Sequence, residues 1–347
     1  MWSNIYMFRI IMKFRQFSLF AIVLLFSWCV TSCKERPAEY LTIEGQALGT
    51  NLKVICCGDI LAEDVVDMVR EIDREAKASM SIFDETSLIS RINRSQTDSL
   101  DCHIIRNLEI AERFVDISGG LYDVTVRPLT EAWGFAGKDM GSVIPNVDSL
   151  LEFVGFDLIS VEEGRLVKRD CRTQLDFNSI AKGYTVDLIA EALEQCGVED
   201  YMVSVGGEIR CKGENSRGAE WTIAIETPYE GNMGYEEAYE KILTLSNCAV
   251  ATSGNYRRYH TAPDGQKVVH TLNPHTGYSV ISDLLSATVV ASTCAEADAA
   301  ATMFMAVGSE GGALELAREC EKNFGWRYYF IYAADEGYRV ECSDSLR

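Results

Sequence analysis

The sequence lacks the excess of basic residues and the spaced Cys and His ligands that mark several common classes of protein. Its 347 residues contain 32 Lys and Arg against 52 Asp and Glu, a formal net charge of −20, and only 4 His. An acidic surface repels nucleic-acid phosphates, so we expect no nucleic-acid partner. Disorder is also unexpected, because 47% of the residues are hydrophobic and can bury a core.

Cysteine is plentiful, but the patterns typical of metal or redox sites are missing. The 12 Cys form no C-x-x-C motif and no Cys/His cluster at metal spacing, which argues against zinc or thioredoxin-like chemistry. Most lie in apolar surroundings, such as Cys248 in Asn247-Cys-Ala-Val, where a small buried side chain is expected. Export would permit disulfides, but the sequence does not define their pairing. The absence of a G-x-S-x-G motif argues against a Ser-His hydrolase.

The first 32 residues have the layout of a secretory signal. Three basic residues and no acidic one precede or flank an apolar run over residues 17–30. The run is shorter than the roughly 20 residues that span a bilayer, although an uncleaved anchor is the alternative. The segment Val30-Thr-Ser-Cys33 resembles a bacterial lipobox, in which Cys33 is lipidated. We therefore expect a signal peptide over 1–32 and a lipidated tether over 33–40, which hold an exported domain at the extracytoplasmic side of a bacterial membrane.

The rest of the chain, residues 41–342, is predicted to form one α+β domain with a single mixed sheet flanked by helices. Helices and strands alternate irregularly, without the steady βα repeat of a barrel or a Rossmann sheet. Apolar spacing predicts helices over residues 60–78, 104–117, 179–196, 294–306 and 309–321. Strands or hairpins are predicted over residues 41–57, 157–175, 201–205, 221–226, 242–251, 284–291, 327–333 and 338–342, and around 263–265.

A strand that runs into a helix over residues 174–187 predicts an anion site. A helix that begins near Ser179 would direct unpaired backbone N–H groups and the positive end of its dipole to this point. Lys182 adds a positive charge one turn further on. Phosphate is the usual ligand of such a site. The alternative is that Asn178 or Ser179 only caps the helix and that Lys182 is a solvated surface residue.

Asp298 and Thr302 predict a site for a hard cation. They lie four residues apart in a strongly helix-forming segment, so the carboxylate and the hydroxyl share one face, whereas Glu296 points elsewhere. Oxygen ligands without His or Cys suit Mg²⁺, which also keeps waters and substrate phosphates as ligands. The alternative is an exposed helical Asp beside a Thr that bonds back to its own helix.

Two polar segments, residues 251–256 and 270–277, flank the hairpin predicted around residue 264, and we expect them to bring Ser253 near His270. His270 is the candidate general base, with a structural histidine as the alternative. The aromatic side chains over residues 119–135 suit either stacking on a planar ligand or packing on the core.

A series of short motifs follows in order along the chain. They are Leu48-Gly-Thr, Met80-Ser-Ile-Phe-Asp, Gly119-Gly-Leu-Tyr-Asp, Leu175-Asp-Phe-Asn-Ser-Ile-Ala-Lys-Gly, Val205-Gly-Gly-Glu, Ala251-Thr-Ser-Gly, His270-Thr-Leu-Asn-Pro and Glu296-Ala-Asp with Thr302. In this order they resemble the ApbE family of FAD:protein FMN transferases, over about residues 41–335. The resemblance implies a T-fold-related α+β domain and agrees with the lipobox, because many members are exported lipoproteins.

The resemblance also implies the reaction and its residues. FAD is the substrate, Mg²⁺ is the cofactor, and FMN is transferred to a Ser or Thr of a recipient protein with a motif like D-x-x-[ST]-G-A-[ST], with release of AMP. The implied flavin contacts are Leu48, Phe83, Leu121, Tyr122, Asp123, Asp176, Lys182, His270, Thr271 and Leu272. The implied Mg²⁺ ligands are Ser179, through its backbone carbonyl, Asp298 and Thr302. The implied catalytic residues are His270, Lys182 and Asp298.

The chain departs from the family pattern at Leu48, Phe83 and His275, where Met, Tyr and a basic Arg or Lys are usual. These positions affect flavin affinity and the phosphate environment, and none of them is a metal ligand. Two alternative functions stay open: hydrolysis of FAD to FMN and AMP, and binding of flavin by a lipoprotein without catalysis.

Overall fold

The computed structural model describes residues 39–137, 143–228, 239–255, 259–263, 265–335 and 337–347. The predicted signal peptide, the lipidation site Cys33 and all of the tether before Glu39 lie outside the described residues, so these expectations stay predictions. Residues Tyr40–Arg347 form one structural unit. No helix in the described part of the chain is long and apolar enough to cross a membrane.

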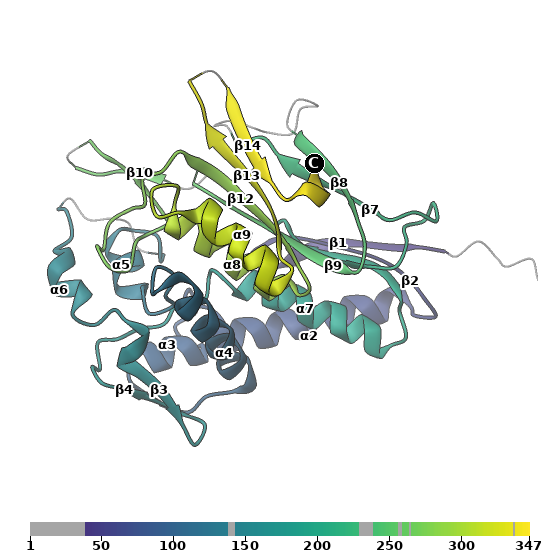
Figure 1. The fold of residues 1–347 in the computed structure, drawn as a ribbon. Coiled ribbons are helices and arrows are strands. Elements are labelled where there is room, and N and C mark those ends of the chain that lie inside the picture. The colour runs from purple at the N-terminus through teal and green to yellow at the C-terminus, as the bar shows by residue number, and fades with distance from the viewer. Residues whose placement is uncertain (1–38, 138–142, 229–238, 256–258, 264, 336) are drawn as a thin grey trace, which may run out of the picture. The chain divides into compact units, whose positions relative to one another are not determined.

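An eight-stranded sheet forms the centre of the unit Tyr40–Arg347 (Figure 1). Its strands lie in the order in which they occur in the chain, and each neighbouring pair is antiparallel. The strands are β1 (Leu41–Ala47), β2 (Thr50–Cys57), β5 (Asp200–Val205), β6 (Glu208–Lys212), β9 (Cys248–Gly254), β12 (Leu284–Ala291), β13 (Arg327–Ala333) and β14 (Tyr338–Cys342). The predicted α+β class, with a main sheet flanked by helices, is confirmed, but this sheet is antiparallel throughout instead of mixed.

The helices lie in two segments of the chain, one between β2 and β5 and the other between β12 and β13. Between β2 and β5 lie α2 (Ala62–Met80), α3 (Leu88–Asn93), α4 (Cys102–Ser118), α5 (Arg127–Ala132), α6 (Val147–Leu151), the short η1 (Phe156–Leu158), the hairpin β3 (Ile159–Glu162) and β4 (Arg165–Lys168), and α7 (Ala181–Gln195). Between β12 and β13 lie α8 (Cys294–Val307) and α9 (Ala313–Phe324), and the chain ends with η3 (Asp344–Leu346). Helix α8 packs on β9 and β12, and α7 packs on β5, β6 and α8 (Figure 1).

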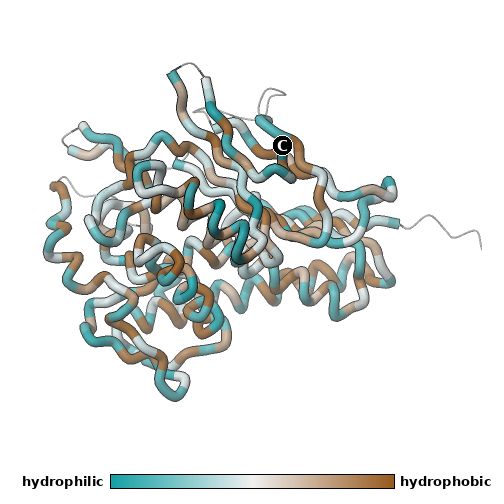
Figure 2. The backbone as a smooth tube through the Cα atoms, viewed as in Figure 1, coloured by the Kyte–Doolittle hydropathy of each residue, from teal (hydrophilic) through white to brown (hydrophobic). Residues whose placement is uncertain are grey.

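The two faces of the sheet are covered differently. Side chains alternate along β9, so that Ala249 and Ala251 face the helices while Cys248 and Val250 face a two-stranded ribbon of β7 (Trp221–Glu226) and β8 (Tyr239–Leu245). Figure 2 shows hydrophobic residues gathered along the central strands and α8, whose residues are almost all buried. The core therefore lies on both sides of the sheet, and the helices and the ribbon shield it from water.

Glycine and turn residues explain where predicted boundaries differ from the structure. The strand predicted over 242–251 is two strands, β8 and β9, because Asn247 adopts a left-handed turn with φ 53°. The helix predicted over 309–321 begins only at Ala313, because Gly312 has φ 85°. The predicted hairpin near residue 264 is confirmed as β10 (Tyr259–Thr261) and β11 (Lys267–Val269). The short elements β6, α3, α5 and α6 were missing from the sequence prediction.

Candidate active site

The site is built where α7 crosses α8 at Gly183. The Gly183 N–H donates to Asp298 Oδ2 at 3.0 Å. A Cβ atom at residue 183 would collide with the carbonyl oxygen of Cys294 and would lie 2.8 Å from Asp298 Cβ. Only glycine permits this approach of the two helices. The Lys182-Gly183 pair in the sequence therefore brings the lysine of α7 next to the carboxylate of α8.

Lys182 lies between two buried carboxylates. Its Nζ donates to Glu208 Oε1 and is 3.5 Å from Asp298 Oδ1. The side chains of Glu208 and Asp298 are 5% and 3% exposed, whereas that of Lys182 is 34% exposed. The cluster thus joins the first turn of α7, the start of β6 and the second turn of α8, and its lysine reaches solvent.

The electrostatics of this cluster favour an added cation. Burial alone would lower the pKa of Lys182, but the carboxylates of Asp298 and Glu208 outweigh burial and raise it. Burial raises the pKa of Glu208 to about 7 although Lys182 opposes the shift, and burial likewise raises the pKa of Asp298. Two carboxylates against one ammonium leave an uncompensated negative charge when all three are ionised.

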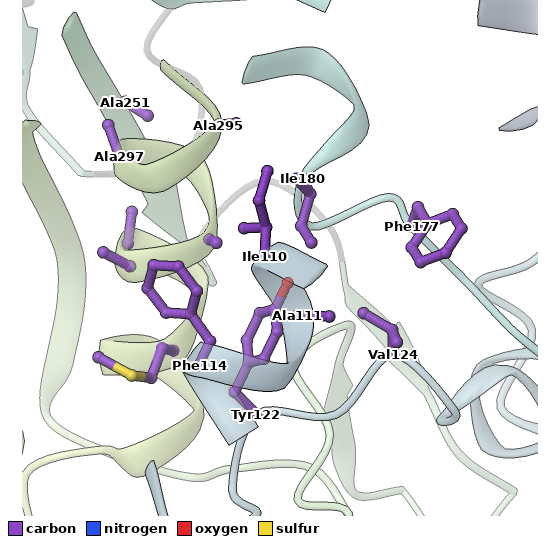
Figure 3. Close-up of a cluster of buried hydrophobic side chains, with 14 of the residues drawn as sticks. Ile110, Ala111, Phe114, Tyr122, Val124, Phe177, Ile180, Ala251, Ala295 and Ala297 are labelled. Carbon is purple, nitrogen blue, oxygen red and sulfur yellow. The ribbon is translucent and has the colours of Figure 1, made fainter. Parts of the chain in front are cut away.

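Thr302 and Ser179 supply further oxygen atoms close to this cluster. Thr302 lies one turn beyond Asp298 on α8, and its hydroxyl is 3.0 Å from the hydroxyl of Ser253 on β9. The Ser179 hydroxyl is 2.8 Å from the Tyr122 hydroxyl. Figure 3 shows the Tyr122 ring within the buried cluster of α4 and α8, with its oxygen directed toward the turn that carries Ile180. Glu296 points away, as predicted, and pairs with Arg113 at 2.8 Å.

The N-terminus of α7 differs from the sequence expectation. The helix begins at Ala181 instead of near Ser179, and Ile180 caps it without a side-chain hydrogen bond. One of its first N–H groups, that of Gly183, already has a carboxylate partner in Asp298. The predicted anion site therefore has no free helix end, and its lysine is already paired with two acids.

Asp123 and Asp176, two of the predicted flavin contacts, fix the loops around the site. Asp123 accepts from the backbone N–H groups of Thr125 and Phe156 at 2.7 and 2.8 Å. Asp176 accepts from the Asn178 N–H at 2.9 Å. Burial raises the pKa of both carboxyls. The carboxylates of Asp123 and Asp176 already accept hydrogen bonds from the protein's own backbone. A ligand that contacts these residues would therefore bind the same oxygen atoms that hold the loops in place.

Of the predicted flavin contacts, Leu48 and Leu121 lie at the periphery of the same helical core, whereas Phe83 is exposed. Leu48 occupies the turn between β1 and β2 with φ 50°, and its N–H donates to Asp73 at 2.7 Å. Phe83, just after α2, is 63% exposed. Leu48 and Leu121 are partly buried against the core of α4, α7 and α8. The exposed ring of Phe83 offers apolar surface to a planar ligand.

His270 and its neighbours form a second, aromatic part of the candidate site. The His270 ring meets Phe135 edge to face, with 6.3 Å between ring centroids. Thr271 donates to the Asn255 side chain at 2.7 Å, and Leu272 is buried with Trp133. The structure pairs Ser253 with Thr302, and the expected approach of Ser253 to His270 stays a prediction.

Sequence reasoning missed the roles of Glu208, Asp187 and Arg210. Glu208 was noticed only as part of a motif, although an acid after two glycines at the start of a buried strand is unusual. Asp187 accepts from the first N–H groups of α8, those of Cys294 and Ala295, at 2.9 and 2.8 Å. Arg210 of β6 donates to the same carboxylate at 2.9 Å. Asp187 thereby joins α7, α8 and β6, the three elements that carry the cluster.

No group of three or more His, Cys, Asp and Glu side chains that could hold a metal ion occurs in the described ranges. The predicted Mg²⁺ ligands are of another kind, since they combine one carboxylate, one hydroxyl and one backbone carbonyl.

Comparisons with known proteins agree with this fold. A model of the ApbE family matches residues 48–324. A curated FAD:protein FMN transferase of Haemophilus influenzae is 34% identical, with 90% of this chain and 92% of the relative covered. One of Vibrio cholerae is 32% identical, with 90% and 93% covered.

Solved structures agree as well. The flavin transferase ApbE of Vibrio cholerae gives a TM-score of 0.79 at 29% identity and covers 89% of this chain and 99% of that one. The flavinyl transferase ApbE of Pseudomonas stutzeri in its apo form gives 0.79 at 28% identity, with 90% and 97% covered. The similarity to these named relatives and the fold shared with these structures define an enzyme of the flavin transferase class. The chain belongs to the ApbE family.

Proposed function

We propose that the protein is a Mg²⁺-dependent FAD:protein FMN transferase. It would transfer the FMN half of FAD to a Ser or Thr hydroxyl of a recipient protein through a phosphoester bond and release AMP. The observation that carries the proposal is the cluster of Lys182, Glu208 and Asp298 at the crossing of α7 and α8, one helical turn from Thr302. The names of the relatives from Haemophilus influenzae and Vibrio cholerae support it.

The residues present fit Mg²⁺. Asp298, Thr302 and the Ser179 carbonyl offer oxygen atoms only, which is the ligand type that Mg²⁺ prefers. The second carboxylate oxygen of Glu208 is buried and has no hydrogen-bond partner among the described residues. The cluster also carries more negative than positive charge. When bound, Mg²⁺ would neutralise charge on the FAD pyrophosphate and help to orient it.

The protein's own residues would then position the reactants and move one proton. Lys182, held by two carboxylates and partly exposed, presents its ammonium group to a phosphate oxygen and stabilises the charge that develops there. The acceptor oxygen forms a bond to the FMN phosphorus while the bond from that phosphorus to the AMP oxygen breaks. His270 is the candidate base that takes the proton of the acceptor hydroxyl. Asp298 orients Lys182 and the first turn of α7.

The family resemblance and the N-terminal sequence support proposals for the partner and the location. We propose a recipient protein with a motif like D-x-x-[ST]-G-A-[ST], which agrees with a transfer reaction that needs an acceptor hydroxyl. We also propose export and lipid anchoring through Cys33, on the basis of the apolar run over residues 17–30 and the Val30-Thr-Ser-Cys33 segment.

An Asp298→Asn variant tests the proposal against a matched control. The protein is incubated with FAD, Mg²⁺ and a recipient domain, and the products are weighed by mass spectrometry. We expect a recipient that gains FMN and an equal amount of AMP. The rate should fall about 10²-fold or more in Asp298→Asn, because the loss of one charge weakens both the metal site and the hold on Lys182. Glu296→Gln on the same helix should keep the wild-type rate, because Glu296 faces Arg113.

The other outcomes distinguish the alternatives. Free FMN with AMP would indicate an FAD pyrophosphatase, and unchanged FAD would indicate a flavin-binding protein without catalysis. Transfer at the wild-type rate in Asp298→Asn would remove the proposed metal site.

A further inference from the structure

Two cysteines lie directly opposite each other in the central sheet, on the face away from the site. Cys211 of β6 and Cys248 of β9 are register partners in an antiparallel pair. Both belong to the buried cluster between the sheet and the β7–β8 ribbon, so their side chains project from the same face. They are 1% and 7% exposed. The Cys211 thiol also approaches the Leu245 carbonyl at 3.7 Å.

The backbone geometry suits a covalent bond between these residues. Opposite residues of antiparallel strands have Cα atoms about 4.5–5.5 Å apart, which lies within the range of about 4.4–6.8 Å found for disulfides. All ten cysteines in the described part of the chain, Cys211 and Cys248 included, are free thiols in this structure. Cys56 is also buried, but its strand partners are Leu41 and Tyr201, and the buried Cys320 lies in helix α9. The pairing therefore separates Cys211 and Cys248 from the other thiols in the described part of the chain.

We propose that Cys211 and Cys248 form a disulfide that joins β6 to β9. The step requires an oxidant, namely a disulfide donor such as glutathione disulfide or a disulfide-bonded thiol oxidoreductase. The Cys248 thiolate attacks the donor, which gives a mixed disulfide and releases one donor thiolate. The Cys211 thiolate then attacks Cys248 Sγ and releases the second donor thiolate. The two cysteines lose two protons and two electrons, and the donor is reduced to two thiols.

The surroundings of the pair agree with this order of attack. A hydrogen bond from Cys211 lowers the pKa of Cys248, and the nearby Arg327 guanidinium lowers it further. The same hydrogen bond, together with burial, raises the pKa of Cys211. The first attacker is therefore the thiol that more readily becomes a thiolate.

The bond would stabilise the strands that carry the candidate site. β6 begins with Glu208, three residues before Cys211, and β9 carries Ser253, which contacts Thr302. A covalent link between the two strands fixes their register on the far face of the sheet. It also closes a covalent loop from residue 211 to residue 248, and this loop contains the β7–β8 ribbon.

Peptide mapping of the full chain tests the proposal. The protein is unfolded with reductant, refolded in a glutathione redox buffer, alkylated in denaturant and digested without reduction. We expect one linked peptide pair that contains Cys211 and Cys248 and is lighter by two hydrogens, whereas Cys320 is alkylated. Alkylation of both Cys211 and Cys248, or a link from either to another cysteine, would overturn the proposal.

A second experiment starts from folded protein and measures the midpoint of thermal unfolding. Reductant should lower the midpoint of thermal unfolding of the oxidised wild type by about 5 °C. It should leave the midpoint of a Cys211→Ala/Cys248→Ala double variant unchanged, and a Cys320→Ala control should respond as the wild type does. An equal response of the wild type and the double variant would contradict the assignment, and the mapping result does not depend on the variants folding.

Discussion

Replacement of Gly183 by Ala tests whether the crossing of α7 and α8 builds the site. The added Cβ would lie 2.6 Å from the carbonyl carbon of Cys294 and 2.8 Å from Asp298 Cβ. Carbon atoms pack at about 3.5–4.0 Å, so the two helices must move apart by about 1 Å. Neither contact is with the flexible end of a side chain, and the strain cannot be relieved by a rotamer change.

The expected cost follows from two opposing effects. Overpacking of a core costs about 1–3 kcal/mol, while Ala in a helix gains about 1 kcal/mol over Gly. A net loss of about 0–2 kcal/mol should lower the midpoint of thermal unfolding by at most a few degrees. The effect on activity should be larger. Lys182 Nζ is 3.5 Å from Asp298 Oδ1, and a displacement of 1 Å in such a site can reduce the rate about 10²-fold.

The assay compares Gly183→Ala with a glycine where the same change is harmless. At Gly45 of β1 the nearest atom to an added Cβ is Leu52 Cδ2, at 3.9 Å. Gly45→Ala should keep the thermal midpoint and the rate of FMN transfer, whereas Gly183→Ala should lower the rate and, by at most a few degrees, the midpoint. A Gly183→Ala protein with the wild-type rate and midpoint would refute the reasoning that contact at this glycine positions Lys182.

Three further predictions concern the surroundings of the site and the rest of the core. Asp187→Asn should lower the free energy of unfolding, measured in urea titrations, by about 2–4 kcal/mol. The reason is that an amide offers one acceptor oxygen, whereas the carboxylate binds two N–H groups and Arg210. The control Glu191→Gln, on the same helix and 55% exposed, should change the free energy of unfolding by less than about 0.5 kcal/mol. Burial lowers the pKa of Lys168 to about 8, so between about pH 8 and 10.5 the unfolded chain holds more protons than the folded protein. The free energy of unfolding of the wild type should therefore rise with pH over this range, by about 1–2 kcal/mol relative to Lys168→Met. Chelation of Mg²⁺ should weaken FAD binding at least 10-fold by isothermal titration, and an unchanged affinity would contradict the metal's role at the pyrophosphate.

The sequence predicts most long elements of this fold because they depend on local patterns. The amphipathic helix α2, with buried Val65, Val69 and Ala76, and the alternating strand β7 each show their period within a few residues. Prediction fails where a single backbone angle decides the boundary, as at Asn247, or where an element is very short, as with α6. Neither case leaves a periodic signal long enough to measure.

The site was only partly predictable, for a different physical reason. Lys182, Asp298 and Thr302 could be selected because each lies in a motif with an evident chemical use. The role of Glu208 depends on the packing of α7 on β6 and β5, which no residue spacing encodes. Asp187 looks like an ordinary helical acid until α8 is placed with its first N–H groups against it. Contacts between distant segments define both residues.

The acidic composition therefore excludes less than it first suggests. A net charge of −20 acts over the whole surface and disfavours long polyanions, which contact many points at once. A dinucleotide contacts one point, and there the balance is set by a few groups within about 4 Å. At that point Lys182 is held by two buried acids, so its ammonium stays charged but largely neutralised. The lysine alone does not attract a pyrophosphate, and a divalent cation beside Asp298 is what would reverse the local sign.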